Sequence, residues 1–118
     1  MKKTKTTKDI IGLTEKVIII GPEKQKKITA RIDTGADTCS IDKKLAKRLG
    51  LEPVKKLKKI KSAYGTRKRR VVMARLEIKK RKFLKVRFTL ADRSHLKYEA
   101  LIGKNILKRN FLIDPSKK

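Results

Sequence analysis

The sequence predicts a single, mainly β domain that carries two short helices. Several runs of residues alternate between apolar and polar side chains, which is typical of strands with one buried face. Turns that contain glycine or proline separate these runs at short intervals, and only two segments have helical spacing. With 118 residues, the chain is long enough for one modest hydrophobic core.

The positions of these runs give the expected order of the elements. Strands are expected at 10–20, 27–32, 38–41, 83–90, 98–102 and 111–113, with a glycine-tipped hairpin over 54–78. Helices are expected at 41–51 and 103–108. Asp42 is a candidate N-cap of the first helix, and Gly50 is expected to end it.

Composition indicates the limits of this domain and its compartment. Residues 1–9 are expected to form a disordered basic tail, 10–115 the domain, and 116–118 a short tail. No apolar run approaches the roughly 20 residues of a membrane span, and the N-terminus lacks the apolar segment of a secretory signal. The single cysteine, Cys39, has no partner for an internal disulfide. A cytoplasmic protein without membrane contact is therefore expected.

The charge of the chain is extreme for a small domain. Lys and Arg number 36 against 11 Asp and Glu, which gives a formal net charge of +25. Such a balance predicts acidic partners, either nucleic acid, an anionic surface or an acidic polypeptide. Nine of the basic residues lie between Lys55 and Arg70, where no acid interrupts them. This run is either a solvated face or part of a substrate site.

The stretch around Asp33 has the pattern of a strand that delivers a carboxylate to a tight turn. Alternating apolar residues end at Ile32, and Asp33 follows directly. Thr34 offers a hydroxyl that can lock the turn, and Gly35 lets the backbone approach whatever Asp33 acts on. Taken alone, Asp-Thr-Gly is a weak signal, because many strand-to-turn junctions favour the same residue types.

A second segment strengthens this interpretation. Asp33-Thr34-Gly35-Ala36 is followed by a helix, a glycine-tipped hairpin, a strand and Leu101-Ile102-Gly103-Lys104-Asn105. This order and spacing resemble those of retropepsin-like aspartic proteases, with Lys104 where those proteases usually have Arg. The resemblance implies a mainly β fold, a single-domain retropepsin-like acid-protease β-barrel with short helices.

The same resemblance implies roles for individual residues. Asp33 would be catalytic, Thr34 would tie two active-site turns together, and the hairpin tip would close over the substrate as a flap. Asp37 would be either a solvated turn acid or the partner of Lys104. The full set of expected substrate-binding and supporting residues is Thr34, Gly35, Ala36, Asp37, Tyr64, Gly65, Ile102, Gly103 and Lys104.

A narrower resemblance extends over nearly the whole chain. Segments 11–17, 30–36, 101–104 and 111–116, together with Asp92-Arg93, resemble the RimK-associated retropepsin-like proteases, long labelled "ATP-dependent zinc proteases". Members lie near ATP-grasp glutamate ligases, and the bacterial type trims glutamates added to a ribosomal protein tail. This chain departs from the pattern at Asp37, where the family often has a basic residue, and at 39–41, where Cys-Ser-Ile stands.

The zinc and ATP of that label find no support in the residues. A catalytic zinc site usually takes three ligands from His, Cys, Asp or Glu, whereas this chain has one His, His95, and one Cys. No glycine-rich loop ends in Lys-Ser or Lys-Thr. We therefore expect no metal and no cofactor, His95 as a loop residue, and Cys39 as a small packed side chain rather than a nucleophile.

The chemistry of an aspartic protease requires two carboxyls. One activates the attacking water and the other protonates the carbonyl oxygen or the leaving amine, because two close carboxyls share one proton. This chain has one Asp-Thr-Gly turn. The aspartic protease interpretation therefore requires a homodimer in which Asp33 of each subunit meets at a two-fold axis.

Three classes of function remain open from the sequence. The first is a homodimeric aspartic endopeptidase that acts on acidic or glutamate-modified protein tails. The second is a basic protein that binds nucleic acid or the ribosome, although most of its five aromatic residues fall in strand positions and few are left for base stacking. The third is a retropepsin-fold binding module without catalysis, against which the intact Asp33-Thr34-Gly35 argues.

Overall fold

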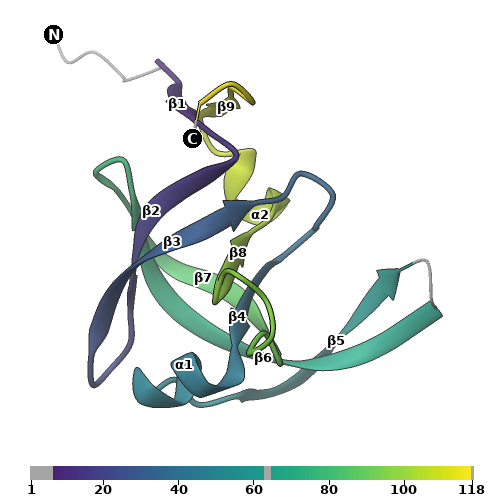
Figure 1. The fold of residues 1–118 in the computed structure, drawn as a ribbon. Helices are drawn as coiled ribbons and strands as arrows, with labels where there is room; N and C mark the ends of the chain where they lie inside the picture. The colour runs from purple at the N-terminus through teal and green to yellow at the C-terminus, as the bar shows by residue number, and fades with distance from the viewer. Residues whose placement is uncertain (1–6, 63–64, 118) are drawn as a thin grey trace, which may run out of the picture.

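The computed structural model describes residues 7–62 and 65–117, and for 55–62 and 66–67 it describes the backbone alone. Most of the described chain is extended, as predicted, and two short helices interrupt it (Figure 1). The helices are α1 (Lys43–Arg48) and α2 (Lys104–Leu107). The strands are β1 (Asp9–Ile11), β2 (Thr14–Ile20), β3 (Gln25–Ile32), β4 (Cys39–Asp42), β5 (Val54–Ser62), β6 (Gly65–Ile78), β7 (Arg81–Ala91), β8 (Ala100–Ile102) and β9 (Phe111–Ile113).

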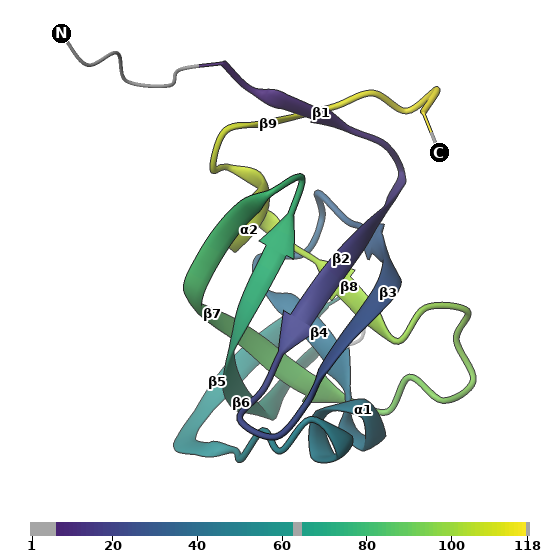
Figure 2. The same ribbon diagram turned by 90° about the vertical axis from the view of Figure 1, so that its left-hand side faces the viewer.

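A closed barrel forms the body of the molecule. Within the described residues the strand order is β2-β3-β8-β4-β7-β6, and pairing of β2 with β6 closes the ring (Figures 1 and 2). Alternate side chains of these strands point inward, so that residues such as Ile19, Leu76 and Phe88 are fully buried. The predicted mainly β barrel is therefore confirmed.

The centre of the barrel brings together the two segments that the sequence analysis singled out. Strand β8 lies between β3 and β4, parallel to β3 and antiparallel to β4. Arg31 is paired with Leu101, and Ser40 is opposite Leu101 on the other side. The turn that follows β3 and the helix that follows β8 consequently lie next to each other.

The predicted hairpin over 54–78 is present as β5 and β6, and its outer half extends beyond the barrel. The inner half of β6, from Val71 to Ile78, pairs with β7. The outer half, from Gly65 to Arg70, pairs with β5 (Figure 1). We call this outer half, together with residues 57–62 of β5, the arm.

Helix α1 is shorter than the segment 41–51 that the sequence predicts. Asp42 has an extended backbone and caps the helix, because its Oδ2 accepts a hydrogen bond of 3.2 Å from the amide of Lys44. The helix ends before Gly50, whose φ of 78° belongs to the left-handed region that glycine adopts without strain. Asp42 is thus confirmed as the N-cap and Gly50 as the residue that terminates the helix.

The predicted strand 10–20 is two strands. Gly12 lies between them, and a Cβ there would stand 2.1 Å from the carbonyl oxygen of Lys117, so a close crossing of the two chain ends separates β1 from β2. Strand β1 pairs in parallel with β9 and begins at Asp9, inside the range expected as a tail. Just before β2, the amide of Leu13 donates a 3.1 Å hydrogen bond to the carbonyl oxygen of Lys117.

The remaining elements differ from expectation mainly at their ends. The terminal strand at 111–113 is confirmed, while β8 begins at Ala100 and not at 98. A turn of two residues, Lys79 and Lys80, joins β6 to β7, and both have positive φ. Strand β7 therefore starts at Arg81 and not at the expected residue 83. No helix among the described residues is long and apolar enough to cross a membrane.

Candidate active site

The turn at Asp33 is held by its own hydrogen bonds and by the barrel beneath it. The amide of Gly35 donates a 2.9 Å hydrogen bond to Oδ1 of Asp33, and the amide of Ala36 donates to the Asp33 carbonyl at 3.2 Å. The amide of Asp33 itself donates to the carbonyl of Ile102 at 3.0 Å. The carboxylate is half-buried, while Thr34 and Gly35 are exposed. The structure thus presents one oriented carboxyl group at the surface.

Gly103 lets α2 approach the backbone of this turn. A Cβ at Gly103 would stand 2.7 Å from the carbonyl carbon of Thr38 and 2.8 Å from the carbonyl oxygens of Ala36 and Thr38. Because backbone atoms cannot move aside as a flexible side chain could, the position has room only for glycine. This contact explains why the two motifs occur together in one chain.

Helix α2 then binds the turn through its first amides. The amide of Lys104 donates to the carbonyl of Ala36 at 2.8 Å, and the amide of Asn105 donates to the carbonyl of Asp37 at 3.1 Å. Nζ of Lys104 lies 3.1 Å from Oδ1 of Asp37. Of the two alternatives expected for Asp37, the pair with Lys104 is therefore present, and it is solvent-exposed, with exposed side-chain fractions of 54% for Lys104 and 82% for Asp37.

Asn105 is a supporting residue that the sequence analysis did not select. Its Oδ1 accepts a 3.0 Å hydrogen bond from the amide of Cys39, and its Nδ2 donates to the carbonyl of Arg87 at 3.1 Å. The side chain therefore joins α2 to β4 and β7. The only signal in the sequence was its place at the end of the Leu-Ile-Gly-Lys-Asn segment.

Cys39 packs beneath the site as a buried thiol. Its side chain is fully buried, and burial raises the pKa of the thiol to about 12, against which hydrogen bonds from Gly103 and to Asn105 act only weakly. Such a thiol carries almost no thiolate at neutral pH. The prediction that Cys39 is a small packed side chain is confirmed.

The other predicted residues lie in different places. His95 is an exposed loop residue between β7 and β8, as expected. Gly65 begins β6 at the tip of the arm with a φ of 112°, and Tyr64 lies outside the described residues. Among the described residues, no group of three or more His, Cys, Asp or Glu side chains could hold a metal ion. The described donor atoms therefore do not fit the zinc of the family label.

A basic cluster near Asp33 was missed by the sequence analysis. Arg93 is only 9% exposed, and its pKa is lowered by burial and by the neighbouring charges of Arg31 and Arg69, while Asp42 and Asp33 act in the opposite direction. Arg93 is thus within electrostatic range of the catalytic candidate and of the arm. These arginines come from three separate segments, so their meeting is a tertiary feature without a local sequence signal.

The architecture and the turn define the class of the protein. The barrel resembles EIAV protease complexed with the inhibitor HBY-793, at a TM-score of 0.59 and 22% identity over 80% of this chain and 84% of that one. It also resembles the protease of simian foamy virus, at a TM-score of 0.58 and 17% identity over 80% and 91% of the two chains. The fold is that of the retropepsin-like aspartic proteases.

The sequence identifies the family. Residues 23–109 match the family described as gag-polyprotein putative aspartyl protease, and the chain belongs to that family. A further structure similar to this chain is Lpg0085 of Legionella pneumophila, a protein of unknown function, with a TM-score of 0.64 and 19% identity over 92% and 94% of the two chains. Comparison with curated proteins gives no match. Fold and family together support protease activity.

Proposed function

We propose that the protein is a homodimeric aspartic endopeptidase whose active site contains Asp33 from each of two subunits. The observation that carries this proposal is the braced turn, which presents a single oriented carboxyl group at the surface. One carboxyl group cannot act as base and acid at once. A two-fold axis through the turn would supply a second carboxyl group, Asp33 of the other subunit. The exposed Thr34 and Gly35 would lie at this axis.

The reaction follows from a pair of carboxyls that share one proton. The ionised Asp33 of one subunit takes a proton from water, whose oxygen attacks the carbonyl carbon of the peptide bond. The protonated Asp33 of the other subunit gives its proton to the carbonyl oxygen, and a tetrahedral diol forms. In the second step the carboxyl group that took the water proton gives it to the amine nitrogen as the carbon–nitrogen bond breaks. The other carboxylate takes a proton from a diol hydroxyl, so that an acid and an amine leave and the pair again holds one proton. The pair would titrate as a unit, with pKa values that belong to both groups.

An acidic substrate is the finer part of the proposal. The described arm carries Lys68, Arg69 and Arg70 on the strand that leaves the barrel, and the chain as a whole has a formal charge of +25. A cleft lined by one sign of charge concentrates a substrate of the other sign. Glutamate-modified protein tails in the cytoplasm, the substrates that the RimK-associated resemblance implies, have that charge.

The catalytic role is tested by replacing Asp33 with Asn, which keeps the shape of the side chain. The wild-type protein should cleave peptides, and Asp33→Asn should lower kcat/KM by on the order of 10³-fold or more without a change in Tm. Asp114→Asn is the matched control, because Asp114 is an exposed acid directly after β9. Equal activity of wild type and Asp33→Asn, combined with inhibition by a chelator, would overturn the proposal in favour of a metallopeptidase.

The dimer is tested by sedimentation at several salt concentrations. Two subunits of formal charge +25 repel each other, so association should strengthen as salt screens the repulsion. Peptidase activity should rise in parallel with the dimer fraction. A strictly monomeric species that cleaves peptides at full rate would contradict the two-fold site. Binding of RNA without peptide cleavage would favour the nucleic-acid alternative.

A further inference from the structure

Strand β7 contains a bulge that turns an apolar side chain out to the surface. Along β6, Ala74 and Leu76 are two residues apart, whereas their partners on β7, Val86 and Phe83, are three residues apart. One extra residue of β7 therefore lies opposite β6, and such a bulge interrupts the alternation of a strand. Regular alternation with the buried Val86 would bury Leu84, yet 70% of Leu84 is exposed.

A cavity of about 320 Å³ lies beside this bulge, on the outside of the barrel. Leu84 lines it from β7 and Arg75 lines it from β6, while Ile20 of β2, which is paired with Arg75, lines its other side. A hollow lined by exposed apolar side chains is typical of a surface that another molecule covers. Further apolar lining comes from Pro22, Leu51 and Met73.

A second cavity, of about 360 Å³, adjoins the first at Met73, which lines both and is 39% exposed. Lys85 and Arg87 line it from β7, and Arg109 lines it from the residues that follow α2. The guanidinium carbon of Arg109 lies 5.8 Å from the centre of the Phe83 ring, and this contact orients the side chain. The second cavity is therefore basic where the first is apolar.

Together the two cavities form one groove with chemically different ends. We call it the outer groove, which extends from Ile20 and Leu84 through Met73 to Arg87 and Arg109. Both cavities fall within the size range of ligand sites, which is roughly 300–1,000 Å³.

The basic end of the outer groove contains more positive than negative charge. Asp37 also lines it, but Oδ1 of Asp37 already lies 3.1 Å from Nζ of Lys104. Within the part of the chain that the structure describes, none of Lys85, Arg87 and Arg109 forms a salt bridge. Three basic side chains are thus available for carboxylates of another molecule.

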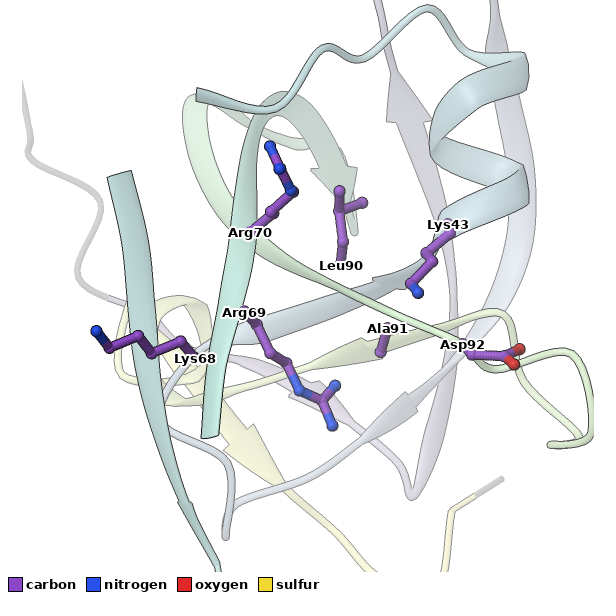
Figure 3. A pocket seen from close by; sticks show the side chains of 7 residues that line it. All are labelled: Lys43, Lys68, Arg69, Arg70, Leu90, Ala91 and Asp92. Atoms are coloured by element: carbon purple, nitrogen blue, oxygen red, sulfur yellow. The ribbon is translucent and has the colours of Figure 1, made fainter. Parts of the chain in front are cut away.

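The cavity beside the arm has a different character. Its volume is about 570 Å³, and four basic side chains and the acidic Asp92 line it together with two apolar side chains. In Figure 3, Arg69 and Lys43 extend toward each other across this cavity, whereas Lys68 leaves β6 on the side away from Lys43. Charges of both signs and a small apolar surface do not define one kind of occupant. The outer groove does so, because its apolar and basic ends are separate.

The charge and the lining of the outer groove argue against two other occupants. A second copy of this chain, packed through the same face, would bring like cations together, and each copy has a formal charge of +25. RNA would be attracted by the cations, but none of the described residues that line the two cavities is an aromatic on which a base could stack. A polypeptide with both apolar and acidic side chains matches both ends.

We propose that the outer groove is a docking site for a polypeptide segment of a partner protein in which apolar residues adjoin acidic ones. The apolar side chains of the segment cover Leu84 and Met73, which removes their exposed surface from water. Its carboxylates pair with Lys85, Arg87 and Arg109, and the two guanidinium groups can each bind both oxygens of a carboxylate. This docking function goes beyond the proposed peptidase activity and does not depend on it.

The test is binding of the fluorescein-labelled peptide Leu-Leu-Gly-Glu-Glu-Glu, and of the same sequence reversed, because the groove leaves the direction of the chain open. The protein is Asp33→Asn, so that no peptide is cleaved, and fluorescence anisotropy measures Kd. At least one direction should bind. Exchange of Leu for Ser in that peptide should weaken binding by about fivefold or more at low and at high salt. Exchange of Glu for Gln should weaken it at low salt and much less at high salt.

Variants of exposed side chains assign the binding to the groove. Leu84→Ser should raise Kd by about fivefold or more without a change in Tm. Leu96→Ser is its matched control, because Leu96 is an exposed leucine of the loop after β7 that lines neither cavity. Arg87→Gln should raise Kd by about fivefold at low salt. Lys47→Gln, which removes the same charge from the exposed side of α1, should leave Kd close to its starting value.

Three outcomes would overturn the docking site. The first is no binding of either peptide up to about 1 mM. The second is an equal loss in Leu84→Ser and Leu96→Ser, or in Arg87→Gln and Lys47→Gln, which would assign binding to general apolar or charged surface. The third is tighter binding of a single-stranded oligouridine that Arg87→Gln weakens and Leu84→Ser does not, which would assign the groove to nucleic acid. None of these results depends on cleavage, so failure of the peptidase proposal would be seen separately.

Discussion

The Asp33 turn is fastened to three other segments of the barrel, whereas the arm is paired within itself. Hydrogen bonds join the turn to β8 through Ile102 and to α2 through Lys104 and Asn105. A further hydrogen bond joins the end of β3 to Leu13. Among the described strands, the outer residues of β6 pair with β5. A reacting group needs a fixed geometry, while a segment that attracts an acidic substrate needs charge. The turn has the fixed geometry that the proposed reaction would use, and the described part of the arm has the charge that the proposed capture of substrate would use.

The largest difference between the regions should appear on substitution of their glycines. Gly103→Ala should lower the free energy of unfolding by about 3 kcal/mol, because its Cβ would overlap backbone atoms of the turn that cannot shift. Gly65→Ala should lower it by about 1 kcal/mol, since only the positive φ is strained and the space around it is open. Urea denaturation at equilibrium measures both. A cost at Gly65 equal to that at Gly103 would show that the arm is as constrained as the turn.

The pH dependence of stability should report the burial of Cys39 beneath the turn. The pKa of this thiol is raised from 9.0 to about 12 in the folded protein. Because the unfolded chain ionises first, the stabilisation is fully present below pH 9 and is lost between pH 9 and 12, by about 1.4 kcal/mol per pH unit. The difference in free energy of unfolding between wild type and Cys39→Ala should therefore narrow as the pH rises from 8 to 10.5. A difference that stays constant would mean that the thiol is hydrated in the folded protein.

A smaller effect is expected at the ion pair that braces the turn. Both side chains are largely exposed, so Lys104→Met should cost about 0.5 kcal/mol or less at low salt and nothing measurable at 1 M salt. Lys104→Arg should restore or slightly increase the stability, because its guanidinium can bind both oxygens of Asp37. Thermal denaturation of the three proteins at two salt concentrations provides the comparison. A large loss in Lys104→Met that persists in salt would show that the backbone hydrogen bonds alone do not hold the turn.

The smallest effect on stability should come from the arm. The double variant Lys68→Gln/Arg70→Gln should change the free energy of unfolding by less than about 0.5 kcal/mol, because both side chains are exposed. The same variant should reduce capture of acidic peptides at low salt and lose this defect at high salt. Stopped-flow binding to the Asp33→Asn protein would measure the association rate. An unchanged rate at low salt would remove the arm from substrate capture.

Much of the fold and of the turn could be predicted from local patterns in the sequence. Alternating apolar residues predicted most strands, and Asp42 and Gly50 marked the start and the end of α1. Two short motifs, Asp33-Thr34-Gly35 and Leu101-Ile102-Gly103, indicated the candidate site. The strands, the caps and the turn each depend on a few consecutive residues, whose backbone preferences act over one turn or one strand. The contact of Asp37 with Lys104, which is present as well, was one of two alternatives that the resemblance to retropepsin-like proteases implied.

Only the tertiary structure decided what residues far apart in the sequence do together. The split of the first strand at Gly12 depends on Lys117, and the hydrogen bond from the amide of Cys39 depends on Asn105. The electrostatic influence of Arg31 and Arg69 on Arg93 depends on three separate segments. No local preference records such meetings, because they arise from the closure of the barrel around β8. The sequence by itself therefore determined the strands, the caps and the catalytic candidate. The closed barrel decided that Arg93 lies within electrostatic range of that carboxyl group and of the arm, because electrostatic forces depend on distance in space and not along the chain.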